Sequence, residues 1–189
     1  MNKKMIAAAL GLAFSGAVLA QAGTVQRDVN QQQRIEQGLQ SGQLNTREAA
    51  RLEREESKVE RDQARALQDG KLSPAEKARL AREQNKVSRD IYREKHDAQT
   101  GNPNSPSSQR MQADVQRNVN QQRRIEQGVR SGELNNREAA RLERGQAHDS
   151  AIQARAGADG QVSPQEQRRI QKSENKQSRR IHREKHDAQ

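Results

Sequence analysis

The stretch DVNQQQRIEQGLQSGQLNTREAARLERE, from Asp28 to Glu55, returns 90 positions later as NVNQQRRIEQGVRSGELNNREAARLERG, from Asn118 to Gly145. The alignment needs no gap. Between residues 25–99 and residues 115–189, 46 of the 75 aligned positions are identical. The chain is therefore a tandem duplication, and its two halves should have the same fold.

The duplication predicts two tandem helical modules, at residues 21–99 and 111–189, joined by a linker at residues 100–110. The linker begins TGNPNSPSS and contains two of the four prolines of the chain, together with Gly, Asn and Ser. This composition is typical of a flexible, partly extended tether. We therefore expect two domains that fold separately on a tether.

A shorter pattern occurs twice in each module and marks a turn between two helices. In the first copy it consists of Gly42, Leu44, Asn45 and Glu48. The Gly supplies the positive φ at which a helix ends, and the Asn with the Glu three residues later forms a capping box that begins the next helix. The four turn glycines are Gly42, Gly70, Gly132 and Gly160.

The composition predicts an all-α protein. Ala, Arg, Gln, Glu and Lys are strong helix formers and are abundant, whereas the whole chain has one Tyr, one Phe and no Trp. Its mean hydropathy of −1.29 is also found in disordered chains, so disorder remains an alternative at this stage. In the first module we expect long antiparallel helices with thin cores, at about 25–39, 46–68 and 74–96, from the spacing of the apolar residues.

The N-terminal segment 1–20 has the pattern of a secretory signal peptide. Two lysines precede a short apolar run at residues 5–18, and small residues follow, so we expect cleavage after Ala20 or Ala22. No later stretch approaches the roughly 20 apolar residues that a membrane-spanning helix needs. The sequence therefore predicts an exported protein, periplasmic or secreted, with no disulfide, since it has no Cys.

Two of the turns, DGKLSPAE at Asp69–Glu76 and DGQVSPQE at Asp159–Glu166, resemble the second half of an EF-hand calcium loop. The resemblance covers the Gly, the aliphatic residue, the Ser and the final Glu of that loop. The first half of the loop is not matched, because its first position holds Arg in both segments. The resemblance implies Ca²⁺ or Mg²⁺ binding by Asp69 with Glu76 and by Asp159 with Glu166. Helix capping without metal explains the same residues.

A second candidate metal site is the pair His182 and His186, which lie four residues apart and so share one face of a helix. Two imidazoles at this spacing can bind Zn²⁺ or Cu²⁺. The first module has a Tyr in place of the first His, and no third ligand is evident. A solvated helix end is the alternative interpretation.

The charge of the chain points to anionic partners. The formal net charge is +10, and the second module is more basic than the first because of its last helix. Such a helix can bind anionic headgroups, extracellular nucleic acid or an acidic protein, although charge also serves solubility. The candidate polyanion-binding residues are Arg168, Arg169, Lys172, Lys176, Arg179, Arg180, Arg183 and Lys185.

These observations predict a non-enzymatic structural or interaction protein of the cell envelope. No nucleophilic Cys, phosphate-binding Gly-rich loop or His-Glu-x-x-His motif occurs. Sequence-specific nucleic-acid binding is disfavoured because stacking aromatic residues are absent. The alternatives are a Ca²⁺-binding module with EF-hand-like turns and a periplasmic stress chaperone. We expect no other cofactor, and self-association remains open.

Overall fold

The computed structural model describes residues 16–187, and within this range the chain forms six α-helices and no strand. The all-α fold class is confirmed. Most of the predicted signal peptide, residues 1–15, lies outside the described residues. Within them, no helix combines the length and the apolar character needed to cross a bilayer. The helices are α1 (Gly16–Ser41), α2 (Thr46–Ala66), α3 (Pro74–Lys95), α4 (Pro106–Ser131), α5 (Asn136–Ala156) and α6 (Pro164–His186).

The predicted turn chemistry is confirmed. A capping box begins α2, α3, α5 and α6, with Asn45, Ser73, Asn135 and Ser163 as the N-cap residues. All four turn glycines have φ between 77° and 92°, a conformation that residues with a side chain rarely adopt. The helix ends are therefore fixed by local sequence.

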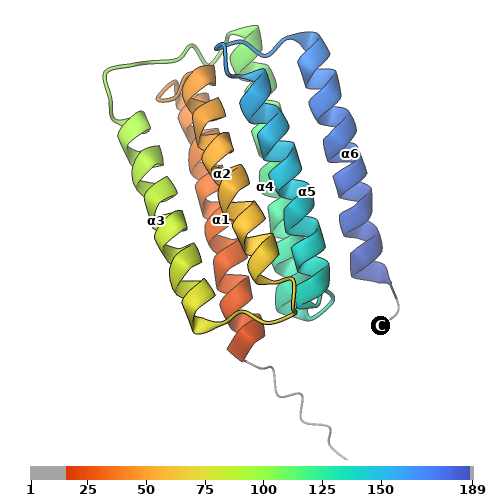
Figure 1. Cartoon of the computed structure of the whole chain (residues 1–189). Helices are drawn as coiled ribbons and strands as arrows, with labels where there is room; N and C mark the ends of the chain where they lie inside the picture. Colours follow the sequence, from red (N-terminus) through yellow and green to blue (C-terminus); the bar gives the residue numbers. More distant parts are fainter. Residues whose placement is uncertain (1–15, 188–189) are drawn as a thin grey trace, which may run out of the picture.

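The helices run alternately up and down, and α1, α2, α4 and α5 form a central bundle that α3 and α6 flank on opposite sides (Figure 1). The most extensive contacts join α1 to α4 and α2 to α5. Each of these pairs consists of the same helix from the two repeats. The repeats thus face each other about an approximate twofold axis that lies across the helices.

The expectation of two separate domains on a tether is not confirmed, because the two repeats share one core. One cluster of buried side chains contains Ile35 and Leu52 of the first repeat together with Val115, Val162 and Ile170 of the second. The sequence did not indicate this shared core, because each repeat has few large apolar residues. Two thin apolar seams bury more surface by packing against each other than either buries alone.

The predicted linker is also shorter and more closely packed than expected. Residues 106–110 already belong to α4. The preceding segment folds over the α1–α2 turn, where the Gly101 N–H donates to the Gly42 carbonyl at 2.8 Å. The Gln112 side chain of α4 also contacts this segment, because its amide Nε2 donates to the Pro103 carbonyl at 2.9 Å.

The interior of the bundle contains many polar side chains. The Gln122 amide Nε2 lies 3.1 Å from Glu60 Oε1 and 3.4 Å from Glu143 Oε2, so one amide donates toward two buried carboxyl groups. Both oxygens of Glu56 lack a hydrogen-bond partner among the protein atoms. The buried acidic residues of the bundle include Asp28, Glu53, Glu56, Glu60, Asp114, Glu143, Asp149 and Glu174.

Burial changes the protonation of these acids. It raises the pKa of Glu53 to about 7 and the pKa values of Glu56, Glu60 and Glu143 well above 4.5, because the charged form is poorly solvated in the interior. A carboxyl group that keeps its proton is neutral and can donate a hydrogen bond. Burial therefore favours the neutral carboxylic acid form of these residues over the carboxylate form.

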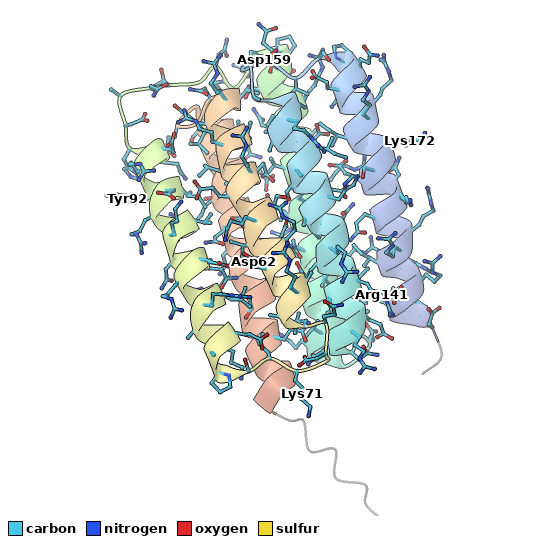
Figure 2. All side chains as sticks on the ribbon, in the orientation of Figure 1. Asp62, Lys71, Tyr92, Arg141, Asp159 and Lys172 are labelled. Atoms are coloured by element: carbon cyan, nitrogen blue, oxygen red, sulfur yellow. The ribbon has the colours of Figure 1, made fainter. Side chains whose placement is uncertain are left out.

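The outer surface is highly charged. Figure 2 shows side chains such as Lys172 extending away from the bundle. Among the described residues, Tyr92 is the one large hydrophobic side chain that is exposed, at 60%. The surface of residues 21–187 therefore presents little apolar area to a partner, and charge is its main recognition feature.

Candidate anion-binding cleft

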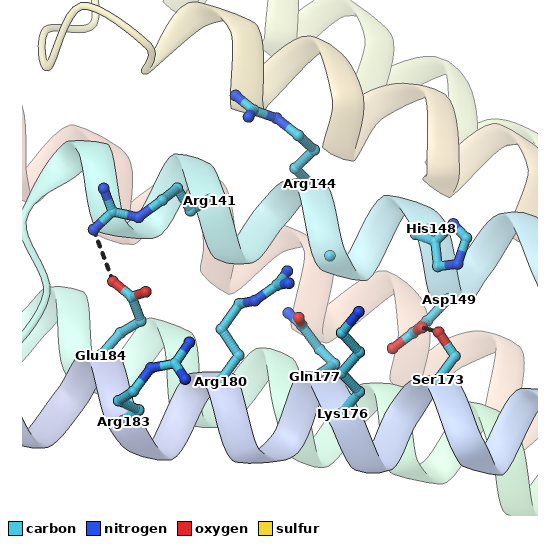
Figure 3. Close-up of a pocket in the computed structure, with 11 residues that line it drawn as sticks. Arg141, Arg144, His148, Asp149, Ser173, Lys176, Gln177, Arg180, Arg183 and Glu184 are labelled. Atoms are coloured by element: carbon cyan, nitrogen blue, oxygen red, sulfur yellow. Dashed lines mark hydrogen bonds and ion pairs between the residues drawn. The ribbon is translucent and has the colours of Figure 1, made fainter.

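A cleft of about 590 Å³ lies between α5 and α6. Figure 3 shows its lining, with Lys176, Gln177 and Arg180 rising from α6 toward α5. The lining residues recur at intervals of three or four on both helices, so each helix contributes one continuous face. They are Arg141, Arg144, Gly145, His148 and Asp149 of α5, and Ser173, Lys176, Gln177, Arg180, Arg183 and Glu184 of α6.

Gly145 and Gln177 form the floor of the cleft. A Cβ atom at position 145 would overlap the side-chain amide of Gln177, so only Gly leaves room for that amide. Gln177 Nε2 donates to the Leu142 carbonyl at 2.8 Å, and Gln177 is buried. The two helices are thus joined by a polar contact at a position where the first repeat has Val87 on α3.

Basic side chains dominate the lining, with five Arg and Lys residues and two acidic ones. Arg141 is held by Glu184, with 2.8 Å between Nη2 and Oε2. Within residues 16–187, the other four basic lining residues have no acidic partner within 4.0 Å. These are Arg144, Lys176, Arg180 and Arg183.

The second acidic residue of the cleft, Asp149, is buried. Burial raises the pKa of Asp149 to about 6, although a hydrogen bond from Ser173 and the charge of Arg180 oppose this shift. The Ser173 hydroxyl donates to Asp149 Oδ1 at 2.5 Å. Asp149 therefore offsets the basic side chains less as the pH falls toward 6.

The same face in the first repeat, between α2 and α3, is neutralised by ion pairs. Lys86 Nζ lies 2.8 Å from Glu55 and 2.6 Å from Asp90, and Lys58 Nζ lies 3.1 Å from Glu83. The positions equivalent to those three acids hold Gly145, Ser173 and Arg180 in the second repeat. This surface is thus ion-paired in the first repeat, whereas in the described part of the second repeat four of its basic residues have no acidic partner within 4.0 Å.

The structure brings together part of the predicted basic set. Lys176, Arg180 and Arg183 line the cleft, whereas Lys185 pairs with Glu133 at 3.1 Å. The remaining predicted residues are exposed on α6 outside the cleft: Arg168, Arg169, Lys172 and Arg179.

Sequence reasoning missed the contribution of α5 to this surface. Arg141 and Arg144 are also present in the first repeat, as Arg51 and Arg54, so their basic character alone did not distinguish them. The signal that could have indicated them is the loss of the neighbouring acids in the second repeat.

The predicted EF-hand-like residues take part in capping. Asp69 Oδ1 accepts the Lys71 N–H at 2.8 Å, and Glu76 Oε2 accepts the Ser73 N–H at 2.9 Å. Asp159 and Glu166 make the equivalent contacts in the second repeat. Metal binding at these turns stays a prediction.

The His182 and His186 rings stack, with 4.2 Å between their centroids. His186 Nδ1 lies 2.7 Å from the His182 carbonyl oxygen, so this nitrogen is used within the helix. In the part of the chain that the structure describes, no Asp, Glu or further His completes a three-ligand group with them.

Comparison with known protein families, with characterised proteins and with solved structures finds no match to this chain. The function is therefore argued from the chemistry of the cleft.

Proposed function

We propose that this chain is an exported, non-enzymatic helical protein that binds an anionic group of a cell-envelope component or an acidic partner in the α5–α6 cleft. The observation that carries this proposal is the set of four basic side chains without acidic partners at Arg144, Lys176, Arg180 and Arg183. Basic residues gathered in a concave site raise the local concentration of anions and bind them through charge-assisted hydrogen bonds.

The shape of the site indicates the kind of ligand. A cleft of about 590 Å³ between two helices suits a compact group with several phosphate, sulfate or carboxylate charges. Three guanidinium groups in the cleft can each bind such a group through two parallel hydrogen bonds. The shortage of exposed apolar side chains favours this anion-binding role over the alternative of a stress chaperone for unfolded clients.

The test compares two charge-matched variants of the full chain on a heparin column. The cleft variant carries Arg144→Gln, Lys176→Gln and Arg180→Gln. The control carries Arg168→Gln, Arg169→Gln and Lys172→Gln, which remove the same charge from the same protein outside the cleft. We expect the cleft variant to elute at distinctly lower salt than the control. It makes fewer contacts to the polyanion, so its binding releases fewer counterions.

Equal elution of the two variants would mean that heparin senses only net charge, and would contradict a specific cleft. Circular dichroism of both variants checks that the helices persist, which we expect because Gln is also a good helix former.

A further inference from the structure

A second cluster of charged side chains lies in the first repeat, where α2 begins and α3 ends. Glu48 of α2, Glu94 of α3 and Asp97 just after α3 each place one carboxylate oxygen within 4.8 Å of the other two. Within residues 16–187, this is the one group of three or more acidic or His residues that meets this distance. The α3–α4 segment then crosses the same end of the bundle (Figure 1).

Glu48 is the buried member of this group. Its side chain is fully buried, and Oε2 accepts the Asn45 N–H of the capping box at 2.9 Å. Its other oxygen, Oε1, is buried without a hydrogen-bond partner among the protein atoms. Burial raises the pKa of Glu48, and the negative charges of Asp97 and Glu94 raise it further. The Asn45 hydrogen bond and the charge of Arg51 oppose this shift, but Oε1 itself is left without a partner among the protein atoms.

Two basic side chains lie near the cluster, but neither forms a close ion pair with its carboxylates. Arg51 Nη2 lies 3.8 Å from Glu94 Oε2, and Arg93 Nη2 lies 3.9 Å from Glu94 Oε1. Both distances exceed those of hydrogen bonds, and both Arg side chains are more than half exposed. In the described part of the chain, no ion pair within 4.0 Å reaches Glu48 or Asp97.

The second repeat contains the same three acids and the same Arg, but arranges them differently. Arg141 Nη2 lies 2.8 Å from Glu184 Oε2 and 4.0 Å from Glu138 Oε1. A guanidinium group therefore supplies positive charge to this position in the second repeat. In the first repeat the equivalent Arg51 lies 3.8 Å from Glu94, and among the described residues no ion pair within 4.0 Å reaches Glu48 or Asp97.

We propose that Glu48, Glu94 and Asp97 bind one Ca²⁺ ion. Oxygen-only ligands select hard cations, and Ca²⁺ takes oxygens at 2.3–2.6 Å. Two oxygens at such distances from one ion are at most about 5 Å apart, which matches the spacing of the three carboxylates. Mg²⁺ demands shorter distances and near-octahedral geometry, so it fits less well. This site does not depend on the proposed anion-binding cleft.

Calorimetric titration of the full chain with CaCl₂ tests this site. We expect one ion per chain with a Kd of about 10⁻⁴–10⁻³ M, because only three protein ligands are present. Asp97→Asn should weaken binding about tenfold or more, since affinity follows the charge of the ligands. Asp97 is exposed, so this variant should keep its helical circular dichroism spectrum.

The repeats supply the matched control. Asp187→Asn makes the same change at the equivalent position of the second repeat and should leave Ca²⁺ binding unchanged. Absence of binding at about 10 mM Ca²⁺, above the weakest range of natural calcium modules, would overturn the proposal. So would binding that is lost in Glu76→Gln with Glu166→Gln but kept in Asp97→Asn, because the ion would then lie at the EF-hand-like turns.

Discussion

Ser57 and Ala147 occupy equivalent positions in the two repeats, and they touch each other: the Ser57 hydroxyl donates to the Ala147 carbonyl at 2.7 Å. Two equivalent residues can meet only near a twofold axis, so this contact marks the axis that relates the repeats. Arg47 and Arg137 show the same symmetry farther out, since each packs against the turn glycine of the other repeat. The chain thus has the geometry of a dimer joined end to end.

The first prediction is that the repeats depend on each other for stability. Separate chains covering residues 21–105 and 106–189 should be poorly helical at low concentration, because each exposes the face that packs on its counterpart. Mixing them should restore helicity and give a one-to-one complex. Circular dichroism with analytical ultracentrifugation measures both effects.

The sequence favoured the opposite outcome, in which each module folds alone. Two helical monomers that ignore each other on mixing would support that earlier expectation and would show that the shared core contributes little. Association of either half with itself would agree with the twofold geometry.

The second prediction concerns pH. Asp28, Glu53 and Asp114 have pKa values of about 7 in the folded protein because they are buried, against ordinary values of 3.8 to 4.5. The folded state therefore holds protons that the unfolded chain has already lost. Proton binding by these three groups favours the folded state. This contribution to the free energy of unfolding is complete below about pH 4 and is lost as the pH rises through 7.

The free energy of unfolding should accordingly decrease between pH 5 and pH 8, with each such group contributing up to about 1.4 kcal/mol per pH unit. Urea unfolding at constant ionic strength measures this trend. A stability that rises over the same range would mean that these carboxyl groups are not buried as the structure has them.

The third prediction isolates one of these acids. Glu56 is fully buried with no hydrogen-bond partner among the protein atoms, and the equivalent position of the second repeat holds Gln146. Glu56→Gln should therefore fit the bundle, stabilise the protein at pH 8 by about 1 kcal/mol or more, and flatten its pH dependence. Glu83→Gln serves as the control: it removes a carboxylate from a partly exposed ion pair with Lys58, so it should lower stability at pH 8 by up to about 1 kcal/mol instead of raising it.

Features that depend on residues close together in the sequence could be predicted, whereas contacts between residues far apart in the sequence could not. The capping pairs, such as Ser73 with Glu76, lie three residues apart, so their chemistry is complete within one turn. Buried acids such as Glu56 look like solvent-facing residues of a helix, because sequence alone does not show which polar face another helix will cover. The pairing of α2 with α5 depends on that face and was therefore missed.

The fourth prediction tests the turns. Gly70 has φ 86°, so Gly70→Val should cost about 1 kcal/mol or more, since a β-branched side chain is strained there. Ser73→Ala should cost about 0.5–2 kcal/mol by removing the cap of α3. Thermal unfolding in EDTA measures both. Effects that appear only when Ca²⁺ is present would show that the turn acts through a metal and not through capping.

The candidate cleft was predicted in part for the same reason. Lys176, Arg180 and Arg183 could be identified because they lie on one basic helix. Arg144 belongs to another helix, and its role depends on the packing of α5 against α6. The gapless alignment of the repeats places Arg180 where the first repeat has Asp90, a replacement of an acid by a base that helps to make this surface basic.

The last prediction links the floor of the cleft to its function. Gly145→Glu introduces the residue found at the equivalent position 55, but its Cβ would overlap the Gln177 amide. We expect a loss of about 1–3 kcal/mol of stability from this overpacking. Adding Gln177→Val restores the pair that the first repeat has at positions 55 and 87, and should recover most of the loss.

Heparin affinity should respond differently from stability. The double variant places a carboxylate beside Lys176, as Glu55 stands beside Lys86 in the first repeat at 2.8 Å. That ion pair should neutralise part of the cleft, so the double variant should be stable yet elute at lower salt than the unmodified chain. A double variant that is stable and elutes from heparin at the same salt as the unmodified chain would contradict this prediction. The charge at the floor would then not affect binding, and the basic residues that bind heparin would lie outside the cleft.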